Sequence, residues 1–218
     1  MPKLAASKAL VEDLVAGSRI LAEHEVLDAY GHLSARSDKR PEHFIMSRSR
    51  APALVTAADL IEWGADSEAV TGDKRKGFIE RYIHGEIYRA RPEVMAVVHS
   101  HSPSVIPYGV TQTKLRPIYH MGSFLWSGAP VWDIRKVREE NDLLVRDRPL
   151  GAALAGALGK CNCVLMRGHG MTVVGEIEGP VAFLSDEEGR RSTAANRGTL
   201  ERPWELWKTR AARATRRS

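Results

Sequence analysis

The stretch EVMAVVHSHSPSVIPYGV, residues 93–110, places two histidines at the end of an apolar run. Short apolar runs are typical of strands, so we expect a strand over VMAVVHSH, residues 94–101. His99 and His101 lie one residue apart, and in a strand their side chains leave the same face with Cα atoms about 7 Å apart. Both imidazoles can then reach one ion. Because histidine pairs also arise by chance, the stretch alone leaves two interpretations open: a metal site or two incidental histidines.

A third histidine favours the metal site. In VLMRGHGM, residues 164–171, His169 follows another apolar run and sits between Gly168 and Gly170. These glycines let two backbone segments approach closely at the end of a strand. Three neutral imidazoles leave open positions on a divalent ion, which is typical of a catalytic site rather than a closed structural one.

Glu80 is the candidate for proton transfer beside such an ion. It lies near the start of a helix expected over FIERYIHGEIYRA, residues 78–90. A glutamate in the first turn also simply favours the helix dipole, so this bland interpretation stays open. His84 follows at i+4 and is expected to orient Glu80 or to pack beneath the site.

Composition and length predict one domain over residues 1–218. The chain has 218 residues, of which 43% are apolar, enough for one sizeable core. No stretch approaches the roughly 18 to 20 apolar residues of a membrane helix, and Glu12 and Asp13 interrupt the region that a signal peptide would need. We therefore expect a soluble, cytoplasmic protein with no membrane partner. Cys161 and Cys163 are expected to be reduced and structural.

The net charge of +5 is concentrated at the end of the sequence. The tail at about residues 199–218 has six basic and two acidic residues, a net charge of +4, so the rest of the chain is nearly neutral. A basic tail without an interleaved aromatic platform or a recognisable nucleic-acid-binding motif is more typical of a solvated or subunit-contacting end than of a nucleic-acid site. We expect no nucleic-acid partner.

The other segments predict a mixed layered domain, α/β in class. Thr56 is expected to cap one short helix, and Ser102 with Pro103 to begin another directly after His101. The remaining expected elements are a helix over residues 4–29, strands at 32–36 and 43–46, a helix at 57–63 (the Thr56-capped segment), a helix at 149–159, a strand over 162–170, a helix near 179–197 and a terminal helix around 203–215.

Three segments together resemble the class II aldolase and adducin family. They are GHLSARSD at residues 31–38, HGEIYRARPEVMAVVHSHSPSVIPYGVT at 84–111 and LMRGHGMTVVG at 165–175, and the resemblance covers roughly residues 8–198. It implies a three-layer α/β/α sandwich with a central, mainly antiparallel sheet. It also implies a homotetramer with active sites at subunit interfaces.

By the same resemblance, His99, His101 and His169 are expected to bind one divalent metal ion per subunit. Glu80 stands nineteen residues before His99, as does the catalytic acid/base of the family. The family expectation for the metal is Mn²⁺ or Zn²⁺, and imidazole ligands also suit Fe²⁺ and Co²⁺.

Departures from the family pattern distinguish its branches. Its sugar-phosphate aldolases bind phosphate through an asparagine in a G-N-x-S segment and through two serines before the catalytic glutamate. This sequence has His32 in GHLS, and Phe78 and Ile79 before Glu80. These residues replace amide and hydroxyl donors that a phosphate needs, so a sugar phosphate fits poorly.

The segments GHLSAR, SRSRAPALV and ERYIH instead resemble the decarboxylase branch. Members of that branch act on hydroxylated aromatic or pyridine carboxylates and on hydroxymuconic semialdehyde carboxylates from ring-cleavage pathways. The main hypothesis is therefore a metal-dependent, non-oxidative decarboxylase in aromatic catabolism. In this hypothesis Glu80, its pKa raised beside Phe78 and Ile79, protonates the ring carbon.

Residues for substrate binding follow from this hypothesis. Phe78 and Ile79 would form an apolar wall for a planar ring, and Arg36, Arg48 and Arg50 are available for carboxylates. Each arginine also has a simpler interpretation, as a surface residue. Tyr119 and His120 are expected to reach the site of a neighbouring subunit. The simpler interpretation of Tyr119 is a packed residue at a strand end. The residues assigned to the substrate are His32, Ser47, Arg48, Ser49, Phe78 and Tyr119.

Two alternatives remain. The first is a metal-dependent aldolase that cleaves a sugar or hydroxy-aldehyde, against which the missing phosphate donors count. The second is a non-catalytic interaction domain of the adducin kind, in which metal ligands have been lost. The presence of all three histidines and of Glu80 argues against the second alternative.

Overall fold

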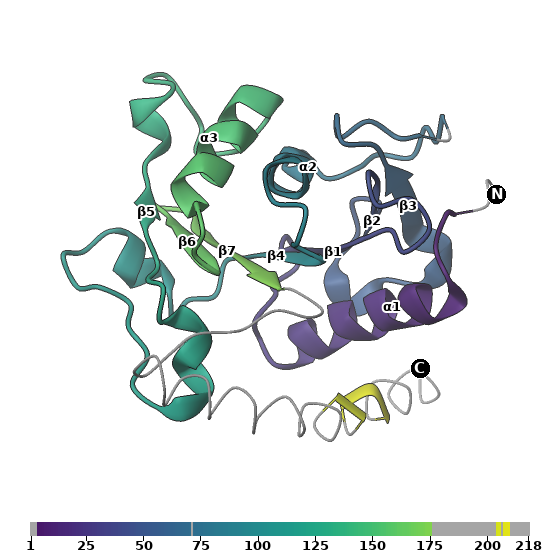
Figure 1. Cartoon of the computed structure of the whole chain (residues 1–218), viewed down its shortest axis with the longest axis horizontal. Helices are drawn as coiled ribbons and strands as arrows, with labels where there is room; N and C mark the ends of the chain where they lie inside the picture. Colours follow the sequence, from purple (N-terminus) through teal and green to yellow (C-terminus); the bar gives the residue numbers. More distant parts are fainter. Residues whose placement is uncertain (1–3, 71, 176–203, 206, 210–218) are drawn as a thin grey trace.

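The fold is built on a seven-stranded sheet with the strand order β3-β2-β1-β4-β7-β6-β5 (Figure 1). The computed structural model describes residues 4–70, 72–175, 204–205 and 207–209. Strands β5 and β6 are parallel, and every other neighbouring pair is antiparallel. The strands are β1 (His32–Arg36), β2 (Phe44–Ser47), β3 (Leu60–Trp63), β4 (Ala96–Ser100), β5 (Val131–Trp132), β6 (Cys163–Met166) and β7 (Gly170–Gly175).

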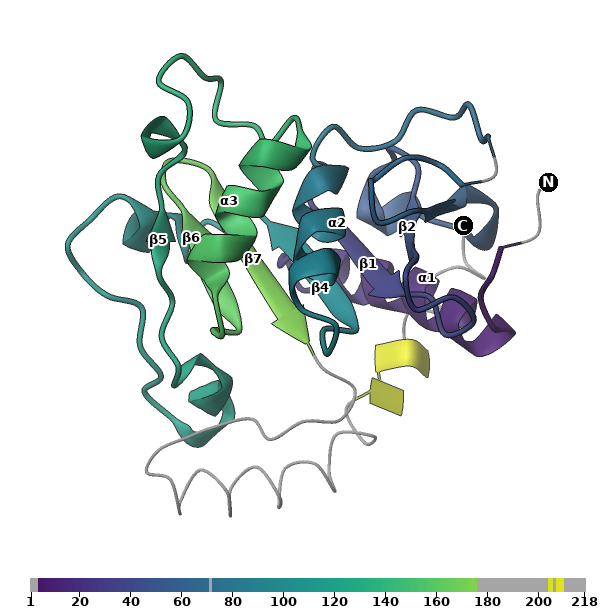
Figure 2. The same ribbon diagram turned by 45° about the horizontal axis from the view of Figure 1, so that its top comes forward.

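Helices cover both faces of this sheet. Helices α2 (Arg81–Ala90) and α3 (Arg148–Leu158) pack against each other on one face, and α1 (Lys8–Glu23) covers the other (Figures 1 and 2). The predicted three-layer α/β/α sandwich with a mainly antiparallel sheet is confirmed. Single-turn and short 3₁₀ helices connect the layers at Pro52–Leu54, Ala57–Asp59, Ile106–Gly109, His120–Leu125 and Ile134–Lys136.

The core lies on both sides of the sheet, and strand β2 shows why. Phe44 and Met46 belong to the apolar cluster beneath α2 and α3, whereas Ile45 belongs to the cluster beneath α1. Alternate side chains of a strand point to opposite faces, and here both faces are buried. The strand therefore begins with three consecutive apolar residues, Phe44, Ile45 and Met46, rather than showing an alternating pattern.

The helix expected at residues 57–63 is wrong. Thr56 and Asp59 do form a capping box, but the helix is only the 3₁₀ turn Ala57–Asp59. Residues Leu60–Trp63 then form β3 and pair with β2. Ile61 and Trp63 fill the cluster beneath α2 and α3, so strand pairing and burial outweigh the local helix signal.

The helix expected to begin after His101 is also wrong. The Val105 amide bonds to the Ser102 carbonyl oxygen in a single turn, and a 3₁₀ helix follows at Ile106–Gly109. An α-helix that started at Ser102 would need an amide donor from Pro107, which has none.

Other boundaries differ from expectation to different degrees. The first helix is shorter than residues 4–29, ending at Glu23. The strand expected over 162–170 ends at Met166, and the chain reverses into β7, which was not predicted. The helix expected near 179–197 lies outside the described residues. Of the terminal helix at 203–215, residues 204–205 and 207–209 are described, and they are helical.

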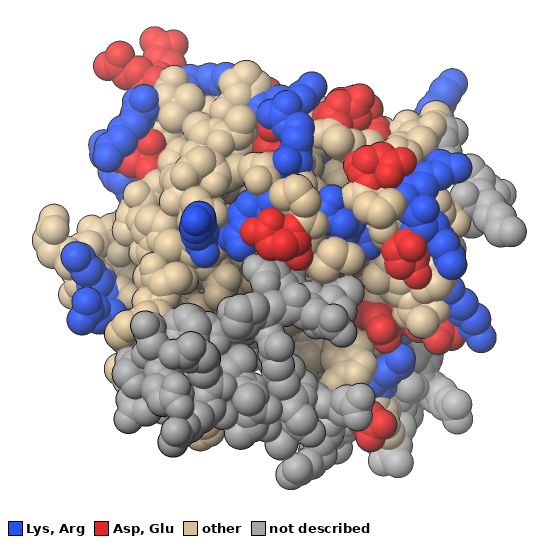
Figure 3. All heavy atoms as spheres, in the orientation of Figure 1, with Lys and Arg blue, Asp and Glu red and all other residues tan. Residues whose placement is uncertain are grey.

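Charges of both signs share the surface. On the face shown in Figure 3, basic and acidic side chains are interspersed, as the nearly neutral charge outside the tail leads one to expect. Arg81 pairs with Glu68 at 3.2 Å, and Arg91 pairs with Glu93 at 2.7 Å. None of the helices in the described part of the chain is long and apolar enough to cross a membrane.

Candidate metal centre

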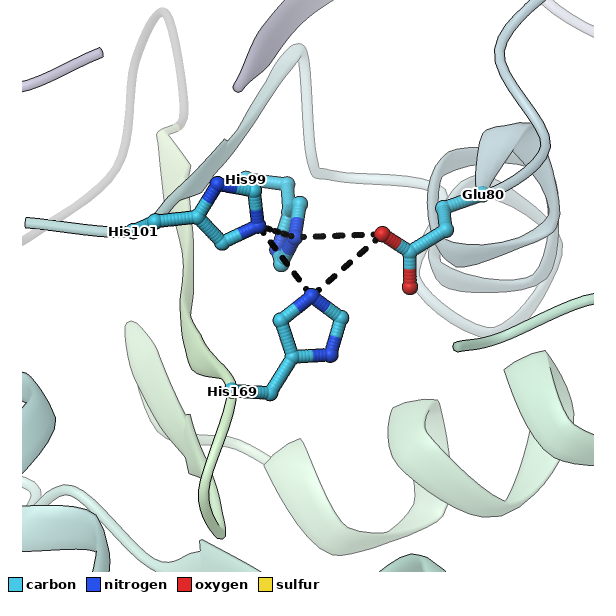
Figure 4. Close-up of side chains that lie close together, drawn as sticks. All are labelled: Glu80, His99, His101 and His169. Carbon is cyan, nitrogen blue, oxygen red and sulfur yellow. Dashed lines mark hydrogen bonds and ion pairs between the residues drawn. The ribbon is translucent and has the colours of Figure 1, made fainter. Parts of the chain in front are cut away.

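Four chemistry-bearing side chains from three parts of the sequence converge at one point (Figure 4). They are Glu80, His99, His101 and His169, and their ligand atoms all lie within 4.8 Å of one another. His99 is in β4 and His101 follows it; His169 lies in the turn between β6 and β7, and Glu80 is the N-cap residue of α2. The structure thus brings together all four residues that the sequence assigned to metal binding and proton transfer.

The fold brings His169 to the histidine pair because β7 lies beside β4. In this pairing Ser100 is opposite Met171, at the end of both strands. A Cβ atom at Gly170 would collide with the Ser100 carbonyl oxygen, so only glycine permits this approach. Gly168 has a φ of +67°, a left-handed conformation that also favours glycine. The two glycines around His169 therefore serve the close approach that the sequence predicted.

The imidazole nitrogens face one another at short range. Nε2 of His101 lies 3.0 Å from Nε2 of His99 and 3.1 Å from Nε2 of His169. Oε2 of Glu80 lies 3.5 Å from Nε2 of His99 and 3.4 Å from Nε2 of His169. Its other oxygen, Oε1, accepts a hydrogen bond of 2.9 Å from the Val145 amide, which fixes the carboxylate toward the histidines.

The opposite ring nitrogens show which tautomer each histidine adopts. Nδ1 of His99, His101 and His169 faces, respectively, the Met171 carbonyl oxygen (3.1 Å), Asp28 Oδ1 (3.1 Å) and the Leu143 carbonyl oxygen (2.8 Å). Each of these oxygens is an acceptor, so in neutral rings Nδ1 carries the proton and Nε2 carries a lone pair. Three lone pairs and a carboxylate oxygen then point at one another.

The three Nε2 lone pairs and the Glu80 carboxylate oxygen repel one another unless a positive charge lies between them. Metal-bound histidines commonly donate their second N–H to a carboxylate or a backbone carbonyl, as these three do. Neutral imidazole and carboxylate are also the donors that first-row divalent metals prefer. The residues present therefore suit a divalent metal ion.

The electrostatics of Glu80 agree with this attraction for positive charge. Burial raises the pKa of Glu80, but the charge of His99 and the hydrogen bond with His169, both of which act when these rings are protonated, outweigh it and hold the pKa below its ordinary value. For His169, burial lowers the pKa, and the hydrogen bond with Glu80 raises it by more. The expected rise in the pKa of Glu80 is therefore wrong in direction. Positive charge at the histidines, from protons or from a metal ion, therefore favours the ionised form of Glu80.

A cavity of about 390 Å³ opens beside the cluster. Glu80 and His101 line it, Phe78 and Ile79 form an apolar part of its wall, and Arg50 and Lys76 bring positive charge. The other lining residues are Ala29, Tyr30, His32, Ser49, Ala51, Gly77 and Leu144. A larger cavity of about 770 Å³, lined by residues between 108 and 131 with Cys161 and Leu165, includes none of the four cluster residues. Another cavity, of about 670 Å³, touches His101 alone of the four, whereas the cavity of about 390 Å³ touches both Glu80 and His101 and is therefore the candidate substrate site.

The residues assigned to the substrate fall into two groups. His32, Ser49 and Phe78 line the cavity. Ser47 is buried in β2, and Arg48 Nε bonds to Asp59 Oδ1 at 2.7 Å; neither is among the lining residues. Tyr119 is exposed and also lies outside the lining of the cavity within one chain.

Arg36 has a structural role. It is buried, and its guanidinium group donates to four backbone carbonyl oxygens, those of Val94, Pro41, Tyr88 and Arg91. Tyr88 is in the last turn of α2 and Arg91 follows it, so the cation also stabilises the C-terminal end of that helix. Its availability to a substrate carboxylate, expected from the sequence, is not what the structure shows.

Sequence reasoning missed several contributors to the centre and its cavity. Asp28 orients His101, the Leu143 carbonyl oxygen orients His169, and Lys76 lines the cavity. Asp28 also accepts hydrogen bonds from the amides of Tyr30 and Gly31, which hold its carboxylate in place. The motif D-x-x-G was a signal for that turn, whereas a backbone carbonyl leaves no signal in the sequence.

Asp28→Asn is predicted to weaken divalent metal binding by about tenfold, because the acceptor of His101 Nδ1–H loses its charge. Competition with a chelator of known affinity measures the change. Asp66→Asn is the matched control, because Asp66 accepts a hydrogen bond from an amide two residues on in an exposed turn after β3. Equal affinities for Asp28→Asn and the wild-type protein would contradict the role given to Asp28.

Comparison with known proteins places this centre in a family. The family model described as Class II Aldolase and Adducin N-terminal domain matches residues 12–178. The solved structure of an aldolase II superfamily protein from Pseudomonas syringae superposes with a TM-score of 0.71 at 18% identity, over 94% of this chain and 93% of that one.

Two curated relatives are decarboxylases. Decarboxylase tropJ of Talaromyces stipitatus is 44% identical over 178 residues, which cover 76% of this chain and 67% of that protein. A 3,4-dihydroxyphthalate decarboxylase of Arthrobacter keyseri is 31% identical over 185 residues, covering 77% of this chain and 70% of that protein. Both are carboxy-lyases, the enzyme class predicted from the sequence. The chain belongs to the class II aldolase and adducin family.

Proposed function

We propose that this protein is a divalent-metal-dependent, non-oxidative decarboxylase of a hydroxylated aromatic or hydroxypyridine carboxylate. The observation that carries the proposal is the cavity that joins the histidine cluster to an apolar wall and to two cationic side chains. The decarboxylase relatives support it, and one of them is named for a dihydroxyphthalate.

In this proposal His99, His101 and His169 hold one ion per chain, Mn²⁺ or Zn²⁺ by preference and Fe²⁺ or Co²⁺ otherwise. When bound, such an ion withdraws electron density from the substrate oxygen atoms that it contacts. The hydroxyl group required on the substrate supplies one of those oxygen atoms.

The cavity walls suit a planar anionic ring. Phe78 packs beside His32, with ring centroids 4.5 Å apart, so an aromatic substrate meets aromatic side chains in the cavity wall. Lys76 has no carboxylate partner at ion-pair distance among the described residues, and it binds a substrate carboxylate in this proposal. Arg50 bonds to the Leu54 carbonyl oxygen and lies 3.3 Å from Asp59, which holds its guanidinium group at the cavity.

Glu80 moves the proton. Its Oε1 is held by the Val145 amide, so Oε2 is the oxygen directed toward the reacting groups. The ionised Oε2 accepts the proton of the substrate hydroxyl and returns it to the ring carbon from which CO₂ departs. The electron pair of the broken C–C bond stays on the ring side, and the oxygen regains a proton from water. Charge and atoms balance without an oxidant.

Retro-aldol cleavage of a sugar phosphate fits the same cavity less well. Phe78 and Ile79 stand where the sugar-phosphate aldolases of the family have serines, and both line the cavity. Their side chains offer no hydrogen bonds to a phosphate group.

Glu80→Gln is predicted to lower kcat for decarboxylation at least about a hundredfold, because the amide cannot transfer the proton. The assay measures CO₂ release from a dihydroxyphthalate and from a hydroxypyridine dicarboxylate. Glu93→Gln, an exposed glutamate paired with Arg91, is the control and should behave like the wild type. Removal of the metal should also abolish activity, and re-addition should restore it.

Undiminished CO₂ release by Glu80→Gln or by the metal-stripped protein would contradict the mechanism. Cleavage of a ketose phosphate without CO₂ release from either carboxylate would instead favour the aldolase.

We also propose that the chain assembles as a homotetramer. The segment at residues 118–126 exposes several large apolar side chains, and Ile118 is 94% exposed. Exposed apolar side chains gathered in one segment are typical of an interface. In such an assembly Tyr119, which lies outside the cavity of its own chain, contacts the site of a neighbouring subunit.

Ile118→Asp is predicted to dissociate the assembly, because a charge in an apolar contact loses its solvation. Light scattering after size-exclusion chromatography should give four times the chain mass of 24.1 kDa for the wild type and a smaller mass for the variant. Leu54→Asp, at an exposed aliphatic residue outside that segment, should remain tetrameric. A monomeric wild-type protein would refute the proposal.

A further inference from the structure

Beneath the cavity, four buried side chains form one continuous hydrogen-bonded chain, which we call the Tyr88–His32 chain. Tyr88 Oη lies 2.8 Å from Ser34 Oγ, and Ser34 Oγ lies 2.6 Å from His84 Nδ1. His84 Nε2 lies 2.7 Å from His32 Nδ1. All four residues are buried, and they connect α2 with strand β1.

The direction of the protons along this chain follows from its inner end. Burial raises the pKa of the Tyr88 phenol, so it keeps its proton. Among the described residues, Ser34 Oγ is the side-chain acceptor within reach of that proton. The phenol therefore donates to Ser34, and the Ser34 hydroxyl is left to donate to Nδ1 of His84. The reverse direction would bury the phenol proton without an acceptor, which is costly.

The histidines continue in the same direction. Nδ1 of His84 accepts from Ser34, so the neutral ring carries its proton on Nε2 and donates to Nδ1 of His32. Burial, together with the positive charge that His99 carries when it is protonated, lowers the pKa of His84 to about 3, which is consistent with a neutral ring. Since Nδ1 of His32 accepts, the proton of a neutral His32 lies on Nε2.

Nε2 of His32 reaches the cavity. No hydrogen-bond partner of this atom is present among the described residues, whereas every fully enclosed side-chain nitrogen or oxygen there has a partner. The atom is therefore accessible from the cavity that His32 lines. The His32 ring is held between Phe78, at 4.5 Å between ring centroids, and His99, at 5.0 Å.

We infer that the Tyr88–His32 chain locks His32 as an Nε2–H donor at the cavity wall, where it binds an anionic oxygen of the substrate. Tyr88, Ser34 and His84 are then positioning residues that act through His32. The identity of that oxygen, a carboxylate or phenolate oxygen of a hydroxyaromatic carboxylate, rests on the proposed function. The tautomer itself does not.

Nitrogen-15 NMR of the histidine side chains tests the tautomer without any assay of activity. The protein is labelled with ¹⁵N-histidine and saturated with diamagnetic Zn²⁺, and the His32 signals are assigned by their loss in His32→Gln. We expect a protonated, pyrrole-like Nε2 and an unprotonated, pyridine-like Nδ1 for His32. The opposite pattern, or two protonated nitrogens, would overturn the inference.

Tyr88→Phe tests whether the Tyr88 hydroxyl group fixes the tautomer of His32, because the substitution removes the phenol proton and keeps the ring shape. The His32 signals should shift toward an average of the two tautomers while the zinc content stays that of the wild type. Unchanged His32 signals in a folded Tyr88→Phe protein would show that the phenol does not direct the chain.

Kinetics then test the use of the donor. His32→Leu should raise KM for the carboxylate at least about tenfold with the metal content unchanged, and His32→Gln, which keeps an N–H donor, should raise KM less. Equal KM values for the two variants and the wild type would remove His32 from substrate binding. A wild-type protein that releases no CO₂ from any carboxylate would refute the proposed function, whereas the NMR result would still decide the tautomer.

Discussion

Three imidazole lone pairs that point at one another are the constraint on which the site depends. Nε2 of His101 lies 3.0 and 3.1 Å from the two other Nε2 atoms, and each Nδ1 faces an acceptor. Neutral rings in this arrangement repel one another, and a divalent cation converts the repulsion into coordination. The fold holds the rings in place through β4, β7 and the glycines that bracket His169. The folded sheet therefore keeps the three rings close together despite their electrostatic repulsion.

The same sheet supplies the chemistry around the cation. Helix α2 packs on one face of this sheet, against β4 and β1. This packing places Glu80 against the histidines and His84 beneath them. Positive charge at the histidines favours the ionised form of Glu80, which is held by the Val145 amide. The Tyr88–His32 chain uses the same helix–strand contact to give His32 a fixed proton. One packing contact therefore orients both a proton-transferring carboxylate and a hydrogen-bond donor toward one cavity.

The sequence was most informative where side chains do chemistry at fixed spacing. The H-x-H pair, the G-H-G turn and Glu80 were all recognisable, and the structure brings them together. The strand β3 was not recognisable, because the Thr56 capping box is a true local helix signal that strand pairing overrides. The role of Arg36 was predicted wrongly, because its guanidinium group donates hydrogen bonds to four backbone carbonyl oxygens, which no sequence pattern reveals. Leu143 and Val145 act through backbone atoms, which no side-chain pattern reveals.

X-ray absorption spectroscopy of the metal-loaded protein tests the central claim most directly, because it counts the imidazoles around the ion. Three histidine nitrogens and at least one oxygen in the coordination sphere are the predicted result for the wild type, with one imidazole fewer in His169→Gln. Fewer than three imidazoles in the wild type, or sulfur scattering from Cys161 or Cys163, would contradict the convergence of lone pairs as the basis of the site.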